Sequence, residues 1–328
     1  MLKSKLEPYE IREWRSEDQS SWLECQRASF GHERAKSAED WEFLMHPLGL
    51  PGRGIVATLE ERVVASYVGI PTRTWFGGEE RICVQAVDLM LHPDLRQGLG
   101  GQRLHRGIAE RFFALYGDGQ GDLMHYGWPI APAARFGRRL LAYEFVREEL
   151  CLVRETLPNV SADPGVQVLH EVGQDLRWLW DRCAGEWGLS TIRDGDWARR
   201  RFLEHPSVDY TLLGVREEGI LRGMCVLRET PWHWEGATAL CDWLVPADEP
   251  EVARRLQAAA FGRAATMGSK RLVCLLPESS RAFALFQEHG WHVQSTPYQL
   301  LLRSFDRRLD ADWVRQHAWL TLADSDLA

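Results

Sequence analysis

Long apolar runs are missing from this 328-residue sequence, and no stretch approaches the roughly 20 residues that a membrane-spanning helix needs. The N-terminal run MLKSKLEPYEI also lacks the apolar core of a secretory signal peptide. The seven cysteines are scattered without a C-x-x-C pair, which disfavours a disulfide framework or zinc ribbon and favours a reducing compartment. We therefore expect a cytoplasmic protein that does not bind a membrane.

An excess of basic residues is missing as well. The chain carries 47 acidic side chains against 39 lysines and arginines, a formal net charge of −8, which disfavours an extended nucleic-acid surface. It contains no G-x-S-x-G, H-E-x-x-H or Walker loop, so a serine hydrolase, a metalloprotease and a nucleoside triphosphatase are not indicated, and no metal site is expected. Its length and 45% hydrophobic content fit a globular protein of two domains.

One stretch combines a strand, a glycine-rich turn and a helix. Residues 84–91 form an apolar run that ends at His92-Pro93, and glycines dominate residues 98–101. Apolar side chains then recur at helical spacing: Leu104, Ile108, Phe112 and Leu115. Glycines let backbone N–H groups approach an anion, and the start of a helix adds partial positive charge. The stretch therefore predicts an anion-binding loop, with Arg96 beside it as a full positive charge.

The run HPDLRQGLGGQRL resembles the pyrophosphate loop of the GNAT acyltransferase superfamily, whose pattern is Gln/Arg-x-x-Gly-x-Gly/Ala. Counted from Arg96, the two glycine places fall on Leu99 and Gly101. Shifted by one residue, they fall on Gly98 and Gly100, but the basic place is then lost. The resemblance implies an acyl-CoA donor held by the loop residues Arg96, Gln97, Gly98, Leu99, Gly100 and Gly101.

The element order of the first half is also that of the GNAT fold. Strands are expected at 10–15, 54–60, 62–76, 84–92, 122–126 and 143–154, and helices at 16–30, 38–45, 102–115 and 132–141. The resemblance implies a mixed α/β sheet in which the acyl-CoA pairs with the backbone of the fourth strand, at Leu89, Met90 and Leu91. Three segments together resemble one bacterial subgroup: Trp41…His46-Pro47-Leu48-Gly49, Asp88…His92-Pro93 and Gly127-Trp128-Pro129.

Short patterns of the first half return in the second half, in the same order and at nearly constant separation. The pairs are DW…FLMHP at 40–47 and DW…FLEHP at 196–206, VDL at 87–89 and CDW at 241–243, and Pro129 and Pro277 with an arginine and a phenylalanine downstream. We therefore expect two tandem GNAT-like domains at 1–155 and 166–305, with a linker at 156–165 and a tail at 306–328.

The second half differs where its phosphate loop should be. After Val245 the sequence is PADEPEVARRL, which has no glycine and carries Asp248, Glu249 and Glu251. Carboxylates at the start of a helix stabilise the helix but repel a phosphate. We expect the N-terminal domain to be cofactor-competent and the C-terminal domain to be degenerate.

Asp88 is the candidate for the general base, because it is a carboxylate in an otherwise apolar strand and burial would raise its pKa. The same residue type recurs at Asp242, where no phosphate loop follows. That recurrence favours a structural role, with Asp88 as the partner of an arginine such as Arg73 or Arg81. Both interpretations stay open.

His125 and Tyr126 are further catalytic candidates, at the end of the strand after the cofactor helix. Strand alternation lets only one of them face the cleft. The usual acid of the family is a tyrosine in the following helix, but Phe136 stands near its place and Tyr143 is a weak substitute. Another group or water then protonates the thiolate, or the chain is not an ordinary acetyltransferase.

The sequence thus predicts an N-acyltransferase that moves an acyl group, acetyl by first expectation, from acyl-CoA to the amine of a small molecule, as a monomer or homodimer. One alternative is an aminoacyl-tRNA-dependent transferase on a GNAT-like fold, which the acidic charge disfavours. The other is a non-catalytic acyl-CoA-binding protein, which the missing tyrosine favours.

Overall fold

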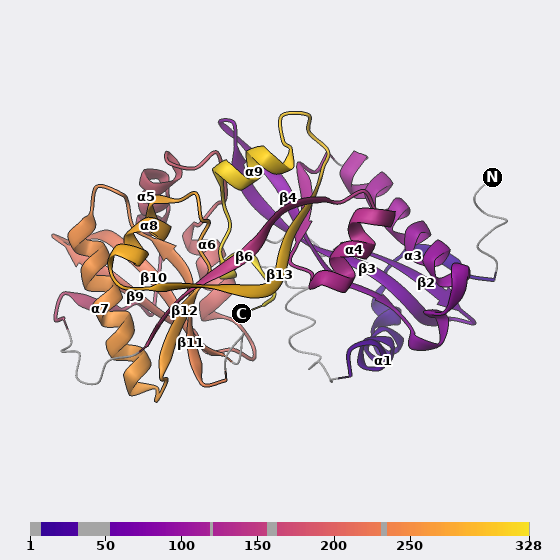
Figure 1. Cartoon of the computed structure of the whole chain (residues 1–328), viewed down its shortest axis with the longest axis horizontal. Helices are drawn as coiled ribbons and strands as arrows, with labels where there is room; N and C mark the ends of the chain where they lie inside the picture. The colour runs from indigo at the N-terminus through magenta and orange to yellow at the C-terminus, as the bar shows by residue number, and fades with distance from the viewer. Residues whose placement is uncertain (1–7, 32–52, 119–120, 156–162, 231–234, 328) are drawn as a thin grey trace. The chain divides into compact units, whose positions relative to one another are not determined.

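The computed structural model describes residues 8–31, 53–118, 121–155, 163–230 and 235–327. Within these ranges the chain is a mixed α/β protein that divides into two compact units (Figure 1). The first unit comprises residues 1–72, 81–145 and 301–310, and the second comprises 73–80, 146–300 and 311–328. The helix expected at 38–45 lies outside the described residues.

A mixed sheet forms the first unit. Its strands, in order across the sheet, are β1 (Glu10–Glu13), β2 (Arg53–Leu59), β3 (Arg62–Phe76), β4 (Glu79–Leu91), β5 (Met124–Gly127) and the end of β13 (His292–Ser304). β2 and β3 are antiparallel, whereas β4 and β5 run parallel. The chain reverses between β2 and β3 at Glu60-Glu61, as expected, with φ of 49° and 64°. Positive φ at both residues matches the right-handed twist of a two-residue hairpin.

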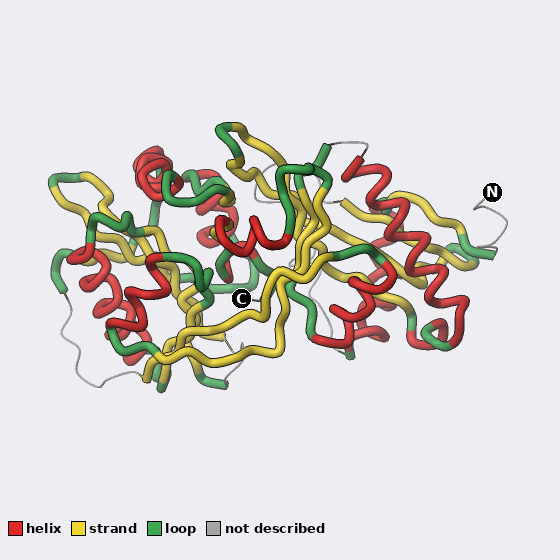
Figure 2. Tube along the Cα trace, turned by 45° about the horizontal axis from the view of Figure 1, so that its top comes forward, coloured by secondary structure: helices red, strands yellow, loops and turns green. Residues whose placement is uncertain are grey.

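Helices cover both faces of this sheet, as Figures 1 and 2 show. α1 (Gln19–Phe30) buries Trp22 and Cys25 against Val56 and Val68 on one face. α3 (Gly98–Phe112) and α4 (Ala131–Leu140) cover the other face. The apolar stripe predicted for α3 is buried there: Leu104, Ile108 and Phe112 are at most 1% exposed.

α3 begins earlier than the sequence analysis expected. Helical backbone starts at Gly98 rather than at residue 102, so the glycine stretch is the first turn of the helix and not a turn before it. Gln97 is the N-cap, with extended backbone. Glycine has a low intrinsic helix propensity, but tertiary packing overrides it at the start of α3.

A β-bulge interrupts β4 at Asp88. Val87 and Met90 both pack in the cluster that contacts α1, although strict alternation would place residues three apart on opposite faces. One extra residue restores the pattern, and Asp88 has the positive φ, 45°, of such a residue. The bulge turns Leu89 and Leu91 toward α3.

The second unit has its own mixed sheet. Its strands, in order, are residues 292–300 of β13, β6 (Glu144–Glu155), β12 (Arg271–Cys274), β11 (Ala237–Leu244), β10 (Ile220–Thr230), β9 (Thr211–Glu217) and β7 (Val166–Val168). Short strands β8 (Leu189–Thr191) and β14 (Ala318–Trp319) pair with each other. The helices are α5 (Gln174–Ala184), α6 (Gly195–Ala198), α7 (Pro250–Thr266), α8 (Arg281–Glu288) and α9 (Ala311–His317).

Local order in the second unit parallels that of the first. β9 and β10 form a hairpin closed by Glu218-Gly219, again with positive φ at both residues. β11 and β12 run parallel, as β4 and β5 do. α7 follows β11 and α8 follows β12, as α3 follows β4 and α4 follows β5.

The two units are interleaved along the chain, whereas the sequence analysis expected consecutive domains. The end of β13 pairs with β5, from Leu301 opposite Gly127 to Ser304 opposite Met124, and so completes the sheet of the first unit. β6 pairs with β12, Val153 facing Val273, and so completes the sheet of the second. Each unit therefore takes one strand from the other half of the sequence.

No helix in the described part of the chain is long and apolar enough to cross a membrane. All seven cysteines are buried free thiols. Burial raises the pKa of the Cys25 thiol to about 11, so this side chain packs as a small apolar group.

A buried charge cluster ties the C-terminal segment to the second unit. The Arg193 guanidinium lies 2.9 Å from Asp242 and 2.7 Å from Asp324, and all three side chains are fully buried. Thr321 donates a further hydrogen bond to Asp242. Burial alone would lower the pKa of Arg193, but the two carboxylates outweigh it and raise the pKa. Asp242 is therefore a structural ion-pair partner.

We predict that Arg193→Met lowers the free energy of unfolding by about 3–5 kcal/mol, because it leaves Asp242 and Asp324 buried without a counter-ion. Denaturant titration measures the change. The control is Arg254→Gln, whose pair with Glu251 is exposed and should contribute little. Equal stability of the two variants would show that the cluster does not hold the segment.

Candidate active site

The candidate site begins where two parallel strands separate. β4 and β5 are paired only from Cys83 opposite Met124 to Gln85 opposite Tyr126. Beyond that point β4 continues to Leu91, while β5 ends at Gly127 and the chain turns into α4. Backbone groups of β4 past Gln85 therefore lose their partner strand, and such groups must find other hydrogen bonds.

The start of α3 lies directly after β4. A short 3-10 turn, Pro93–Leu95, links them, and the first turn of α3 packs against it. A Cβ on Gly101 would lie 2.2 Å from the Leu95 carbonyl oxygen, so only glycine fits there. A Cβ on Gly100 would meet nothing within 4 Å. Gly101, the second glycine place in the alignment counted from Arg96, is therefore the position under steric constraint.

Arg96 does not project freely from this loop. Its Nε donates to the Leu91 carbonyl at 2.9 Å, and Nη2 donates to the Ser29 carbonyl at 2.9 Å. The guanidinium thus joins the end of β4 to the end of α1 and holds a positive charge near the start of α3. Its first structural role is to fix the loop, a role that the sequence analysis did not expect.

His105, one turn further along α3, was not among the sequence candidates. Its imidazole hydrogen-bonds the Met90 carbonyl of β4 and packs 5.0 Å from the Phe136 ring of α4. Nε2 is buried and has no partner among the described residues. Burial lowers the pKa of His105 to about 4, so the ring is neutral at pH 7. The only sequence signal was a histidine next to Leu104 in the apolar stripe.

Asp88 lies at the bulge, beside the point where the strands separate. Its side chain is half-buried, and its backbone carbonyl accepts a hydrogen bond of 3.0 Å from Ser66 Oγ. Arg73, one suggested partner, forms ion pairs with Glu80 and Asp194. Of the predicted catalytic residues, Asp88 is partly exposed, whereas His125 and Tyr126 are buried.

His125 is a core residue rather than a cleft residue. It is fully buried among the rings of Phe112, Phe113 and Phe305, and its Nε2 lies 2.8 Å from Asp122. Burial lowers the pKa of this imidazole. Its Nε2 is engaged by a buried carboxylate that also pairs with Arg53, and the imidazole is enclosed in the core.

The tyrosine candidates are buried as well. Tyr126 is 1% exposed and packs edge-on against Trp128, 5.3 Å between ring centroids. Tyr143, the suggested substitute acid, shares a hydrogen bond with Tyr67 in the core beneath α3. Burial raises the pKa of both Tyr67 and Tyr143. Neither Tyr126 nor Tyr143 lies at an open surface of the site.

No group of histidine, cysteine and carboxylate side chains in the described ranges could hold a metal ion. The site therefore combines three features. β4 and β5 separate, the N-terminus of α3 follows β4, and the half-buried Asp88 carboxylate lies at the bulge. Helix N-termini bind phosphate through their free N–H groups, and a bare strand edge can pair with an amide-containing chain.

Residues 10–140 match the acetyltransferase (GNAT) domain family. The N-terminal half contains a GNAT domain. No curated protein matches the sequence.

Solved structures share the fold over most of the chain. A probable N-acyltransferase of Enterococcus faecalis V583 aligns with a TM-score of 0.67 at 16% identity, over 90% of this chain and 73% of that one. A GCN5-related N-acetyltransferase of Kribbella flavida gives 0.61 at 18% identity, over 90% and 71%. N-myristoyltransferase of Saccharomyces cerevisiae, solved with myristoyl-CoA, gives 0.60 at 13% identity, over 90% and 82%.

The GNAT match covers every described element of the candidate site, from β1 to the end of α4. It leaves the second unit outside, apart from the short segment 73–80. The identities to the solved structures are below 20%, so those structures establish the fold and not the reaction.

Two adjacent glycines of the GNAT loop provide a matched test. We predict that Gly101→Ala destabilises the protein by about 1–3 kcal/mol, because the new methyl group overlaps the Leu95 carbonyl. Gly100→Ala should not destabilise it, because the methyl group meets open space and alanine favours a helix. Thermal midpoints of the two variants, compared with the parent, check this; equal midpoints would contradict the tight packing at Gly101.

Proposed function

We propose that this chain is an N-acyltransferase that moves an acyl group, acetyl in the first instance, from acyl-CoA to the amine of a small-molecule acceptor. The observation that carries the proposal is the parting of β4 from β5 beside the start of α3. The GNAT match over residues 10–140 supports a transferase of this general kind.

In this proposal the pyrophosphate of CoA binds the first turn of α3, where N–H groups of residues 98–100 have no partner within the helix. Arg96 adds positive charge beside them, although its guanidinium also fixes the loop. Gln97 is the N-cap residue, with extended backbone. The pantetheine amides pair with those backbone groups of Leu89–Leu91 that neither β5 nor the His105 and Arg96 side chains occupy.

The acceptor amine has to lose a proton before or as its nitrogen attacks the thioester carbonyl. Asp88 is proposed to take that proton, directly or through one water molecule. The C–N bond forms as the C–S bond breaks, and the leaving thiolate of CoA takes a proton from solvent. Phe136 occupies the region where a tyrosine acid was expected, so the chain supplies no phenol there.

A non-catalytic acyl-CoA-binding protein remains the second candidate. The specific observation in its favour is that His125, Tyr126 and Tyr143 are all buried in the core. The role of Asp88 therefore distinguishes an acyltransferase from a non-catalytic acyl-CoA-binding protein.

We also propose that the chain is a tandem protein whose second GNAT-like half, near residues 166–305, has lost the CoA site. Support comes from the parallel order of β11, α7, β12 and α8. Pro250 occupies the first turn of α7, and Glu251 adds negative charge to that turn. Proline lacks an N–H donor and the carboxylate repels phosphate, so this helix start is poorly suited to a pyrophosphate.

Calorimetric titration with CoA should give one site per chain, because the α3 start has glycines beside Arg96, whereas the corresponding start of α7 has Pro250 and Glu251. A variant that places a carboxylate at the α3 start, Gly100→Asp, should abolish the binding heat by repelling the pyrophosphate. The matched control is Arg254→Asp, at an exposed position in the first turns of α7, which should leave the CoA heat unchanged. Two equivalent CoA sites would contradict the asymmetry between the halves.

Asp88→Asn separates enzyme from binder. Asparagine tolerates the positive φ of this position and keeps the size of the side chain while removing the carboxylate. If Asp88 is the base, turnover should fall by about 10²–10⁴-fold while CoA affinity stays near that of the parent.

The comparison variant is Asp242→Asn, at the corresponding strand position in the second unit. It should lower the thermal midpoint, because Arg193 loses part of its pairing, without reducing turnover per folded molecule. The same pattern in Asp88→Asn, lost stability with normal turnover per folded molecule, would remove Asp88 from the mechanism.

A further inference from the structure

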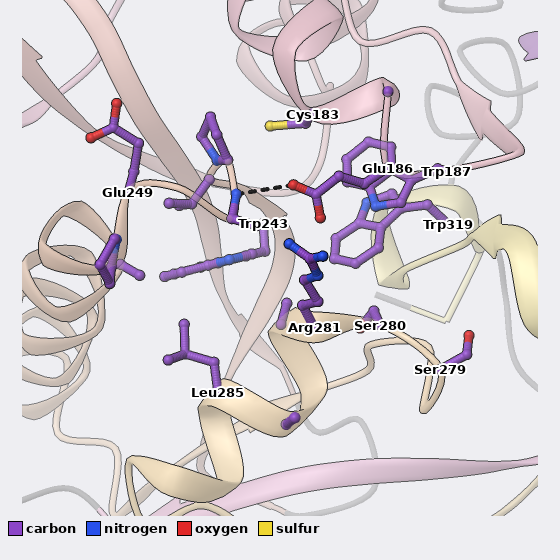
Figure 3. Close-up of a pocket in the computed structure, with 18 of the residues that line it drawn as sticks. Cys183, Glu186, Trp187, Trp243, Glu249, Ser279, Ser280, Arg281, Leu285 and Trp319 are labelled. Carbon is purple, nitrogen blue, oxygen red and sulfur yellow. Dashed lines mark hydrogen bonds between the residues drawn. The ribbon is translucent and has the colours of Figure 1, made fainter.

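A cavity lies wholly inside the second unit. It has a volume of about 640 Å³, within the range of small-molecule sites. Its walls come from the end of β11, the start of α7, the start of α8 and the segments around Trp187 and Trp319 (Figure 3). By element order this is the place that corresponds to the proposed acyl-CoA site of the first unit.

Aromatic rings line one side of this cavity. Trp187 and Trp319 are stacked, with centroids 4.4 Å apart and ring planes 9° from parallel. Trp243 contributes a third indole from β11, held edge-on by Phe286. Leu285 and Val245 extend the apolar lining. Flat apolar surfaces of this kind favour a planar ligand.

Of the three acidic side chains at the cavity, Glu249 is paired with arginines and Glu186 accepts a backbone hydrogen bond. Glu249 pairs with Arg182 at 3.1 Å and with Arg222. Glu186 accepts the Ala247 backbone N–H at 3.0 Å, which Figure 3 shows as a dashed line. Glu288, which also lines the cavity, is exposed. The negative charge of Glu249 is therefore already balanced without a cationic ligand.

Two donors at the cavity have no partner among the described residues. Arg281, in the first turn of α8, is exposed, forms no hydrogen bond or ion pair with a described residue, and points toward Glu186 in Figure 3. The indole Nε1 of Trp319 is also without an acceptor, although this side chain is only 2% exposed. A buried N–H group normally has an acceptor, so a ligand that fills the cavity should supply one.

The hydroxyl groups nearby do not change this balance. Ser280 Oγ donates to the Pro277 carbonyl and accepts the Phe283 N–H as the N-cap of α8. Ser279 Oγ donates to the Arg315 carbonyl. The cavity thus offers free donors, flat apolar walls and acidic groups that are engaged or exposed.

We propose that this cavity of the second unit binds a small planar organic carboxylate, with the ring system against the indoles and the carboxylate on Arg281 and Trp319 Nε1. A phosphate-rich ligand is disfavoured, because Asp248, Glu249 and Glu251 surround the start of α7. The site is distinct from the proposed acyl-CoA site and does not depend on it.

The test uses the full-length protein and three probes with the same ring: indole-3-acetate, tryptophol and tryptamine. They carry an anionic, a neutral and a cationic side chain, and calorimetry or ligand-observed NMR measures their dissociation constants. Indole-3-acetate should bind about tenfold or more tightly than tryptophol, because a charge-assisted hydrogen bond is roughly twice as strong as a neutral one. Tryptamine should bind most weakly.

Variants then locate the site. Arg281→Gln should weaken indole-3-acetate about tenfold and leave tryptophol unchanged, since only the charge pair is lost. Trp319→Phe removes the N–H donor but keeps a ring, and its thermal midpoint shows whether it folds. Arg254→Gln, on α7 with its guanidinium paired to Glu251, is the matched control and should bind as the parent does.

The outcomes also separate this proposal from the proposed function. CoA and indole-3-acetate should bind additively, and Gly100→Asp should lose CoA without affecting indole-3-acetate. Equal affinity for the three probes, no binding at millimolar concentration, or an unchanged affinity in Arg281→Gln would overturn the proposal. Loss of CoA binding alone would count only against the acyltransferase.

Discussion

Parallel pairing that stops after three residues is the constraint on which the first unit depends. β4 and β5 separate beyond Gln85 and Tyr126. On that side of β4 the backbone N–H and C=O groups need hydrogen-bond partners other than a strand. Side chains meet part of this need: His105 takes the Met90 carbonyl and Arg96 takes the Leu91 carbonyl. The loop, the helix start and the bulge are therefore positioned by the same hydrogen-bonding requirement that leaves a strand edge available to a ligand.

A parallel strand pair separates in the second unit as well, and different residues line the space that it leaves. β11 and β12 pair from Ala237 opposite Arg271 to Leu240 opposite Cys274, and the strands then part. Trp243 follows there, whereas Leu89 follows the bulge of the first unit, and three indoles line the resulting space. The aspartate that precedes each of these residues has a different environment, because Asp242 is fixed by Arg193 in a dry interior.

The strand and helix pattern of the first unit could be predicted because it rests on local signals. Residue spacing predicts the apolar stripe of α3, the Glu60-Glu61 turn and the strand before His92. The start of α3 was misplaced because packing against Leu95 overrides the low helix propensity of glycine.

Side-chain direction could not be predicted where it depends on partners that are distant in the sequence. His125 looked available, yet Phe305, from the far end of the chain, covers it. Arg96 matched a phosphate-binding position, yet Ser29 of α1 accepts one of its donors. His105 was passed over because a histidine in an apolar stripe gives no signal until its hydrogen bond with Met90 is known.

The interleaving of strands has a consequence for biosynthesis. β5 is made long before its neighbour, the Leu301–Ser304 end of β13, leaves the ribosome, a delay on the order of ten seconds at ordinary elongation rates. During that interval the nascent first sheet has an unpaired edge at β5, a surface open to association with other chains. Separating the halves by cleavage at 156–165 would leave each fragment without one of its own strands. Gene fragments divided at that linker are therefore expected to need co-expression to yield soluble protein.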